Sequence, residues 1–360
     1  MQTDFNRQIG QLLMIGIGGT TLTGEEERFI RDRQIGGVIL FSRNVTDPVQ
    51  CAELIRHLRS LTETPMLIGI DQEGGRVARL RPPFTCFPTA RRLGEYDRPE
   101  TTYQCAAAMA AELTAVGINL NFAPVLDIDT NPTNPIIGDR AFGATPEQVT
   151  RHALQVIAGL QDHGVIACGK HFPGHGDTST DSHHTLPLCD LSSQRMNEVE
   201  LAPFAAAISA GVGCLMTAHV QYPQIDDRWP ASLSEEVVNG LLRGRLGYDG
   251  VVVTDDLEMK GITDGFSVAD AAVRGIAVGS DIALICHRLD LQQAAFEALR
   301  QAIDAGEVGD EQLGRSLDRI GRLKARFQFD HPQTPEVVAT VVGCAAHQAC
   351  VAAVCDVASL

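Results

Sequence analysis

Short apolar runs alternate with longer amphipathic stretches along the chain from about residue 12 to residue 300. Continuous apolar runs of this length, separated by helical patterns, are typical of parallel strands that are buried on both faces. The eight runs span residues 12–18, 37–42, 66–71, 118–127, 165–171, 213–219, 250–256 and 281–286. The pattern therefore predicts eight parallel strands joined by helical crossovers.

The segments between the runs carry the usual signals of helix ends. Residues 47–61 begin with an Asp-Pro pair, and residues 145–164 begin with Thr-Pro and end in Gly. Right-handed βαβ units in this number close into a (β/α)8 barrel, whereas a doubly wound open sheet is the alternative arrangement. Residues 310–327 read as one further amphipathic helix. We expect one catalytic domain over residues 1–330 and a helical tail of no assigned function over 331–360.

Composition narrows the class of protein. Hydrophobic residues make up 44% and charged residues 21%, as in ordinary globular domains. The formal net charge of −16 argues against nucleic acid and anionic membranes as partners. The N-terminal sequence lacks the pattern of a secretory leader, and we expect no stretch to reach the ~18 apolar residues of a membrane span. Ten cysteines without a CxxC pair suit buried thiols in a reducing compartment, so we expect a cytoplasmic protein.

Polar residues end several of the apolar runs, where the active site of such a barrel lies. A single polar residue at a strand end is often only a cap, but here five runs end in this way. The residues are Asp71, Asp127, Asp129, Lys170, His171, His219, Asp255 and Asp256.

A long loop rich in histidine and glycine follows the fifth run, with the sequence KHFPGHGDTSTDSHHTLP over residues 170–187. Asp181 and His183 stand two residues apart in it, close enough for the carboxylate to accept a hydrogen bond from one imidazole nitrogen. The other nitrogen is then free for proton transfer, and the neighbouring carboxylate favours the imidazolium form of an acid catalyst.

The seventh run ends in VVVTDDLEM, which supplies a possible partner for that acid. Because side chains alternate along a strand, Asp255 and Asp256 should not both point into the pocket. A carboxylate on one side of a sugar and an acid across from it would suit glycoside hydrolysis. The simpler alternative is that the pair caps the following helix.

These segments together closely resemble the bacterial β-N-acetylhexosaminidases of glycoside hydrolase family 3. The resembling stretches are GGVILFSRN, IDQEGGRV, NFAPVLDI, IIGDRAFG, KHFPGHGDTSTDSHHTLP and TDDLEM, in that order. The resemblance implies that Asp255 is the nucleophile, His183 the general acid/base and Asp181 its partner. It also implies that the hydroxyl and acetamido groups of N-acetylglucosamine are bound by five residues, Asp71, Arg79, Arg140, Lys170 and His171.

By the same resemblance the protein is expected to remove terminal β-linked N-acetylglucosamine from peptidoglycan turnover fragments, including 1,6-anhydro-muropeptides, with retention and without a cofactor or metal. Two-domain β-glucosidases of the family take their acid/base carboxylate from a second domain. The pattern here predicts one barrel, so the Asp181/His183 pair in its own loop is the available acid. We expect a monomer.

Three other interpretations stay open. A metal-dependent barrel hydrolase could use His171, His175, His183 and His184, although no H-x-H pair follows the first run. A substrate-assisted hexosaminidase would use the acetamido oxygen as nucleophile, with Asp255 and Asp256 as acid and orienting pair. A non-enzymatic sugar-binding barrel would need only the binding residues. The preferred fragment and the choice between water and phosphate as acceptor also stay open.

Overall fold

The eight apolar runs form one parallel sheet in the computed structural model of the chain, which describes residues 2–178, 186–327 and 332–355. The strand order is β11-β8-β7-β6-β3-β2-β1-β12. A parallel bridge between Val253 and Ile282 joins the two ends of this order, so the sheet is nearly closed into a barrel. The predicted (β/α)8 barrel is confirmed, and the doubly wound open sheet is wrong. The strands are β1 Leu13–Gly16, β2 Gly37–Leu40, β3 Leu67–Ile70, β6 Leu120–Asn121, β7 Ile166–Phe172, β8 Cys214–Thr217, β11 Val251–Thr254 and β12 Ala283–Ile285.

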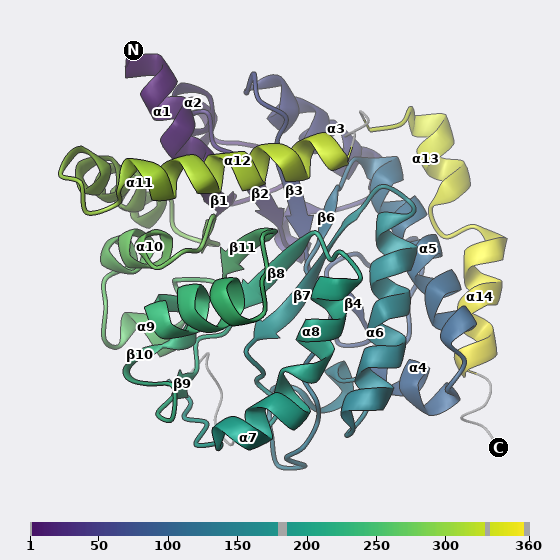
Figure 1. Cartoon of the computed structure of the whole chain (residues 1–360). Coiled ribbons are helices and arrows are strands. Elements are labelled where there is room, and N and C mark those ends of the chain that lie inside the picture. The colour runs from purple at the N-terminus through teal and green to yellow at the C-terminus, as the bar shows by residue number, and fades with distance from the viewer. Residues whose placement is uncertain (1, 179–185, 328–331, 356–360) are drawn as a thin grey trace.

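Helices surround this sheet (Figure 1). Two short antiparallel ribbons lie outside the barrel, one made of β4 Gln72–Gly74 and β5 Val77–Ala78 and the other of β9 Gln221–Tyr222 and β10 Asp226–Pro230. The helices of the first half are α1 Gln2–Gln11, α2 Gly24–Arg33, α3 Pro48–Ser60, α4 Ala90–Tyr96, α5 Pro99–Val116 and α6 Pro146–Gln161. Those of the second half are α7 Ser193–Arg195, α8 Ala202–Ser209, η5 Glu236–Arg245, α9 Lys260–Thr263, α10 Val268–Ala277, α11 Leu289–Asp304, α12 Asp310–Arg326, α13 Pro335–Val341 and α14 Ala345–Cys355, with single turns at Ser42–Asn44, Gly138–Arg140, Met196–Glu200 and Ala231–Leu233.

The helix starts follow the sequence signals. Asp47 caps α3, where its carboxylate accepts from the backbone N–H groups of Val49 and Gln50, and Pro48 occupies the first turn. Thr145 caps α6 through the N–H of Gln148. These caps satisfy donors that the first turn of a helix would otherwise leave unpaired.

Large and small side chains alternate inside the barrel. A Cβ atom at Gly69 would lie 2.9 Å from the ring of Phe122, and one at Gly37 would lie 2.6 Å from the terminal methyl group of Met14. Phe122 and Met14 are fully buried. The interior is therefore a filled core, and the room for a ligand lies at the end of the barrel.

The helix predicted over residues 310–327 is α12. Nζ of its Lys324 is buried and lies 2.6 Å from Oε1 of Gln11, at the end of α1, and 3.2 Å from the carbonyl oxygen of Gly36, just before β2. Helix α12 thus lies against the amino-terminal ends of the strands (Figure 1). The opposite end of the barrel remains for the functional site.

The tail forms two short helices, α13 and α14, which lie against α3, α4 and α5 (Figure 1). The stretch Pro335–Cys355 is long and apolar enough to cross a membrane by length and composition, and 22% of its 18-residue apolar window is buried. The expectation that no stretch would be so apolar was wrong. The chain leaves helical geometry between α13 and α14, where Gly343 has φ = 64° and Val342 is extended. The division of the chain at residue 330 stays a prediction.

Candidate active site

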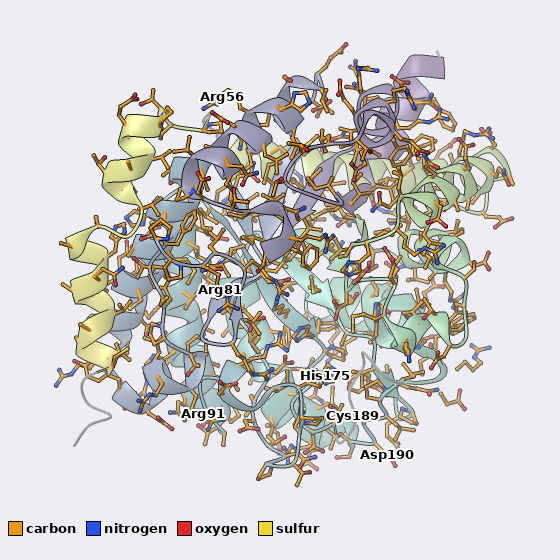
Figure 2. All side chains as sticks on the ribbon, turned by 180° about the vertical axis from the view of Figure 1, so that it is seen from behind. Arg56, Arg81, Arg91, His175, Cys189 and Asp190 are labelled. Carbon is orange, nitrogen blue, oxygen red and sulfur yellow. The ribbon has the colours of Figure 1, made fainter. Side chains whose placement is uncertain are left out.

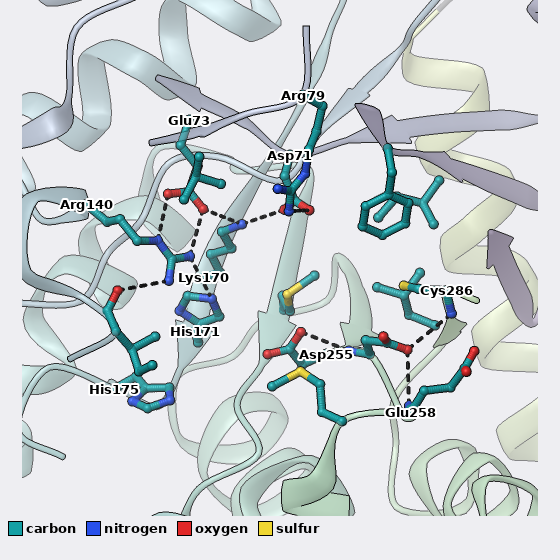
Figure 3. A pocket seen from close by; sticks show the side chains of 18 of the residues that line it. Asp71, Glu73, Arg79, Arg140, Lys170, His171, His175, Asp255, Glu258 and Cys286 are labelled. Atoms are coloured by element: carbon teal, nitrogen blue, oxygen red, sulfur yellow. Dashed lines mark hydrogen bonds and ion pairs between the residues drawn. The ribbon is translucent and has the colours of Figure 1, made fainter. Parts of the chain in front are cut away.

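A pocket of about 570 Å³ opens at the carboxyl ends of the barrel strands. The six predicted site residues that the structure describes all line it, and they come from five strand ends and loops along more than half of the chain. Figure 3 shows one cluster of charged side chains, with the carboxylate of Asp255 facing the same space. The residues are Asp71, Arg79, Arg140, Lys170, His171 and Asp255.

Asp71 follows β3 and binds two cations. Its Oδ1 accepts from Nζ of Lys170 at 2.8 Å, and its Oδ2 accepts from Nη2 of Arg79 at 3.0 Å. Burial alone would raise the pKa of Asp71, but the charges of Lys170 and Arg79 outweigh it and hold the pKa below its usual value. Asp71 is therefore ionised at neutral pH and fixes both cations at the pocket wall.

Glu73 is a residue that the sequence interpretation missed. Its carboxylate accepts two hydrogen bonds from Arg140, Nε–Oε2 at 2.9 Å and Nη2–Oε1 at 2.8 Å, and Oε1 lies 2.7 Å from Nζ of Lys170. Burial would raise the pKa of Glu73, but Arg140 and Lys170 lower it far below its usual value. Glu73 stands two residues after Asp71, on the same side of an extended chain, and this alternation could have identified it.

Lys170 lies between these two carboxylates and is almost completely buried. Burial would lower its pKa, but Asp71 and Glu73 outweigh that effect and raise it. The ammonium group is therefore charged, and its position is set from two sides. An oxygen-rich ligand that enters the pocket could therefore bind the ammonium group of Lys170 without a rearrangement of that side chain.

His171, next to Lys170 on β7, is oriented by a buried aspartate. Its Nδ1 lies 2.7 Å from Oδ2 of Asp127, and its Nε2 lies 3.4 Å from Nη2 of Arg140. Asp127 also accepts from the backbone N–H of His175 at 2.6 Å. Burial would raise the pKa of Asp127, but His171 and these hydrogen bonds lower it. The Asp127 carboxylate thus favours the tautomer of His171 that carries a proton on Nδ1.

Asp255 follows β11 and is partly exposed to the pocket. Its Oδ1 accepts from the backbone N–H of Asp256 at 2.8 Å. Burial would raise the pKa of Asp255, but His219, His171 and Lys170 are close enough to lower it below its usual value. A carboxylate that stays ionised beside a cationic cluster is suited to attack or to stabilise a developing positive charge.

Asp256 also lines the pocket, so the expectation that only one of the two aspartates would do so was wrong. Strand β11 ends at Thr254, and the alternation of side chains stops there. Oδ1 of Asp256 accepts from the N–H groups of Glu258 at 3.1 Å and Cys286 at 3.2 Å. Asp256 therefore holds the turn after β11 against the end of β12, which is close to the capping role considered from the sequence.

Residues 170–178, the first part of the histidine loop, are held by the barrel. The side-chain amide of Asn134 donates to the carbonyls of His175 at 2.9 Å and Gly176 at 3.0 Å. Nδ1 of His175 lies 2.8 Å from Oγ1 of Thr178, and burial lowers the pKa of His175 to about 4. His175 is thus a neutral side chain in the wall of the pocket.

Asp181 and His183 fall within residues 179–185, outside the described residues, so their predicted roles stay predictions. The chain resumes beside β9, where the N–H of Cys189 donates to the carbonyl of Gln221 at 2.8 Å. Figure 2 shows His175 and Cys189, which flank this segment, toward the lower end of the molecule, with Arg56 of α3 toward the upper end. Both flanks are therefore at the end of the barrel that carries the pocket.

Two other strand-end residues act in the framework. His219 is fully buried, with Nδ1 2.7 Å from Oγ of Ser232 and Nε2 2.9 Å from the carbonyl of Asp256. Asp129 pairs with Arg91. Among the described residues, no group of three His, Cys, Asp or Glu side chains is arranged to hold a metal ion. His183 and His184, which the metal-dependent alternative requires, are outside that part of the chain.

Comparison with known proteins gives one consistent family. The family model described as the glycosyl hydrolase family 3 N terminal domain matches residues 5–323. A β-hexosaminidase of Bordetella parapertussis is 39% identical over 322 residues, 88% of each chain. The β-hexosaminidase A of Pseudoalteromonas piscicida is 39% identical over 335 residues, and the match spans 86% of this chain but only 56% of that longer protein.

A solved structure agrees with these relatives. The structure of NagZ from Neisseria gonorrhoeae in complex with N-trifluoroacetyl-D-glucosamine superimposes with a TM-score of 0.81 at 35% identity, over 96% of this chain and 98% of that one. The similarity therefore extends over the whole barrel, at a level of identity where fold and family are shared.

Proposed function

Since the chain belongs to glycoside hydrolase family 3 and is a hydrolase of the β-hexosaminidase type, we propose that it is a retaining exo-β-N-acetylglucosaminidase with Asp255 as its nucleophile. Its substrates would be peptidoglycan turnover fragments that end in β-linked N-acetylglucosamine, including 1,6-anhydro-muropeptides. We place this activity in the cytoplasm, in a monomeric enzyme that needs no cofactor.

The observation that carries the proposal is the position of Asp255 opposite a rigid polar cluster in one pocket. Asp71, Glu73, Arg140 and Lys170 form a connected set of ion pairs at 2.7–2.9 Å. Such a set offers donors and acceptors to the hydroxyl and acetamido groups of a sugar, and a sugar bound to it would have its anomeric carbon near Asp255.

The charge state of Asp255 agrees with a nucleophilic role. Its lowered pKa leaves the carboxylate ionised at neutral pH. In a retaining glycosidase such a carboxylate attacks the anomeric carbon and the aglycone oxygen leaves with a proton from an acid across the ring. Water, deprotonated by the same acid/base group, then releases the sugar with its original anomeric configuration.

The proton donor is assigned to His183 with Asp181, by resemblance to the family. The other described carboxylates of the pocket support this choice, because they are already engaged. Asp71 and Glu73 bind cations, Asp256 accepts from two backbone N–H groups, and Glu258 accepts from the N–H groups of His287 at 2.7 Å and Arg288 at 3.0 Å. The cations also lower the pKa of Asp71 and Glu73, which makes these two carboxyl groups poor acids.

The test is to trap the glycosyl-enzyme. The enzyme is incubated with a 5-fluoro-N-acetylglucosaminyl fluoride, and intact mass and peptide mapping locate the adduct. The expected result is one sugar on the peptide that contains Asp255, present in Asp256→Asn and absent in Asp255→Asn. No adduct, together with strong inhibition by a thiazoline analogue, would instead favour the substrate-assisted mechanism, and binding of N-acetylglucosamine without turnover would favour a sugar-binding protein.

A further inference from the structure

Two cysteines that are 245 positions apart in the sequence meet on the outside of the barrel. Cys105 lies on α5 and Cys350 on α14, and their sulfur atoms are 3.5 Å apart. Helix α14 runs beside α5 (Figure 1). The two sulfurs are in contact, and an approach to the bonded distance of about 2 Å requires only a small movement of the tail.

The two thiols differ in reactivity. Cys105 is buried, with 2% exposure, whereas Cys350 is partly exposed. The hydrogen bond with Cys105 lowers the pKa of Cys350 to about 7, although burial opposes this, and this shift favours the thiolate form of Cys350. Cys350 is therefore the accessible nucleophile, and Cys105 is the adjacent thiol that can resolve a modified Cys350.

Few side chains of helix α14 are buried. On α14, Val351 and Val354 are buried, and most of its other residues are exposed. Glu112 of α5 accepts from the N–H of Gly343 at 2.9 Å and lies 2.8 Å from Nδ1 of His347. A covalent bond between Cys105 and Cys350 would thus add a strong restraint to a weakly packed helix.

We propose that Cys105 and Cys350 form a site of reversible oxidation, at which a small-molecule disulfide such as oxidised glutathione converts the two thiols into an intramolecular disulfide. The sulfur of Cys350 attacks the reagent, and a mixed disulfide forms on Cys350 while one reduced thiol leaves. Cys105 then loses its proton and attacks the Cys350 sulfur, and the second reduced thiol leaves. Two electrons pass from the protein to the reagent, which departs as two thiols.

The chain offers an internal control for accessibility. Cys168 of β7 and Cys214 of β8 are register partners inside the barrel, and their exposure is 0% and 1%. Burial raises the pKa of Cys168 well above its usual value. This pair is also close in space, but both thiols are shielded from solvent, so the pair should stay reduced under the same conditions.

The experiment treats the full-length protein with oxidised glutathione at pH 7.5, blocks free thiols with an alkylating agent, and maps peptides without reduction. The expected product is a peptide that links Cys105 to Cys350, with Cys168 and Cys214 still reduced and the link reversed by dithiothreitol. Cys105→Ser should instead accumulate the glutathione adduct on Cys350. Cys355→Ser, on the same helix, should leave the link intact.

The oxidised protein should also unfold at a higher temperature, by on the order of 5 °C, and Cys350→Ser should show no such shift on oxidation. The proposal fails if Cys105 remains open to alkylation after Cys350 has been modified, or if Cys350 links to Cys355 or to a second molecule. This outcome is independent of the glycosidase activity, because neither cysteine lines the active-site pocket.

Discussion

Glu73 and Arg140 face each other in a two-bond ion pair, at 2.9 Å and 2.8 Å, across the polar side of the pocket. Both side chains are largely buried, with 6% and 11% exposure. The same carboxylate reaches Lys170, so one acidic residue sets the positions of two of the predicted sugar-binding cations. Glu73 therefore acts on a substrate through Arg140 and Lys170.

Glu73→Gln should weaken catalysis through this positioning role. The amide keeps the shape of Glu73 but loses its charge and cannot accept both bonds from Arg140 and one from Lys170. Since bonds to charged groups contribute about 1.5–3 kcal/mol each, we expect kcat/KM to fall roughly ten- to hundredfold, mainly through KM. Steady-state kinetics on an aryl N-acetylglucosaminide would measure this.

The exposed Glu95→Gln is the matched control and should change neither parameter. If Glu73→Gln lowered the melting temperature but left KM unchanged, Glu73 would serve only the fold.

Asp255→Ala should abolish turnover while sugar binding is largely kept, because the side chain makes its main interaction in the transition state. KM or the binding constant of N-acetylglucosamine should change little. Retention of about a tenth or more of the wild-type kcat would show that Asp255 is not the nucleophile.

The acetamido group of the substrate should be decisive for catalysis, because a glucoside would lose the hydrogen bonds that we assign to Arg140, Lys170 and His171. Each lost bond to a buried polar group costs about 1–3 kcal/mol, which corresponds to roughly ten- to hundredfold in kcat/KM. Matched aryl glucoside and N-acetylglucosaminide substrates would measure the ratio. Equal values for the two would refute the assignment of this cluster.

The fold could be predicted from sequence because the signal was local. Each strand is a run buried on both faces, and the polar residues that follow the strands, such as Asp71, Lys170 and Asp255, meet because parallel strands end at one edge. The pairings inside the pocket could not be predicted in this way. Lys170 and Asp71 are 99 positions apart and Arg140 and Glu73 are 67 apart, and only the closed barrel determines which of many charges become partners.

Local geometry beyond the strands also escaped the sequence interpretation. Asp255 and Asp256 were not both expected to face the pocket, but Asp256 also lines it, from a turn where strand alternation no longer applies. The ten cysteines were interpreted together as buried thiols, and nothing in the spacing of Cys105 and Cys350 shows that α14 packs on α5.

Lys324 should make stability depend on pH. Burial lowers its pKa in the folded protein from 10.5 to about 7, so between these values the unfolded chain binds a proton that the folded chain does not. Stability should therefore rise with pH from about 7 to 10.5, by up to about 1.4 kcal/mol per unit, and this contribution should be constant below 7. Urea unfolding of the wild type and Lys324→Met at several pH values measures it. Parallel profiles for the two proteins would contradict the prediction, since the other titrating groups are common to both.

Asp181 and His183, which fall outside the described residues, should act as one proton-delivery unit, and the leaving group can test this. A sugar alkoxide needs a proton to depart, whereas an activated aryl group such as dinitrophenolate leaves almost unaided. His183→Ala should therefore reduce glycosylation by a natural disaccharide on the order of 10²- to 10⁴-fold and affect the dinitrophenyl substrate far less. Asp181→Asn should show the same pattern, because the amide neither stabilises imidazolium nor favours the required tautomer. Single-turnover rates with both substrates separate this step from product release. Equal losses for the two leaving groups would place His183 and Asp181 in substrate binding, because a binding contact acts on both substrates alike.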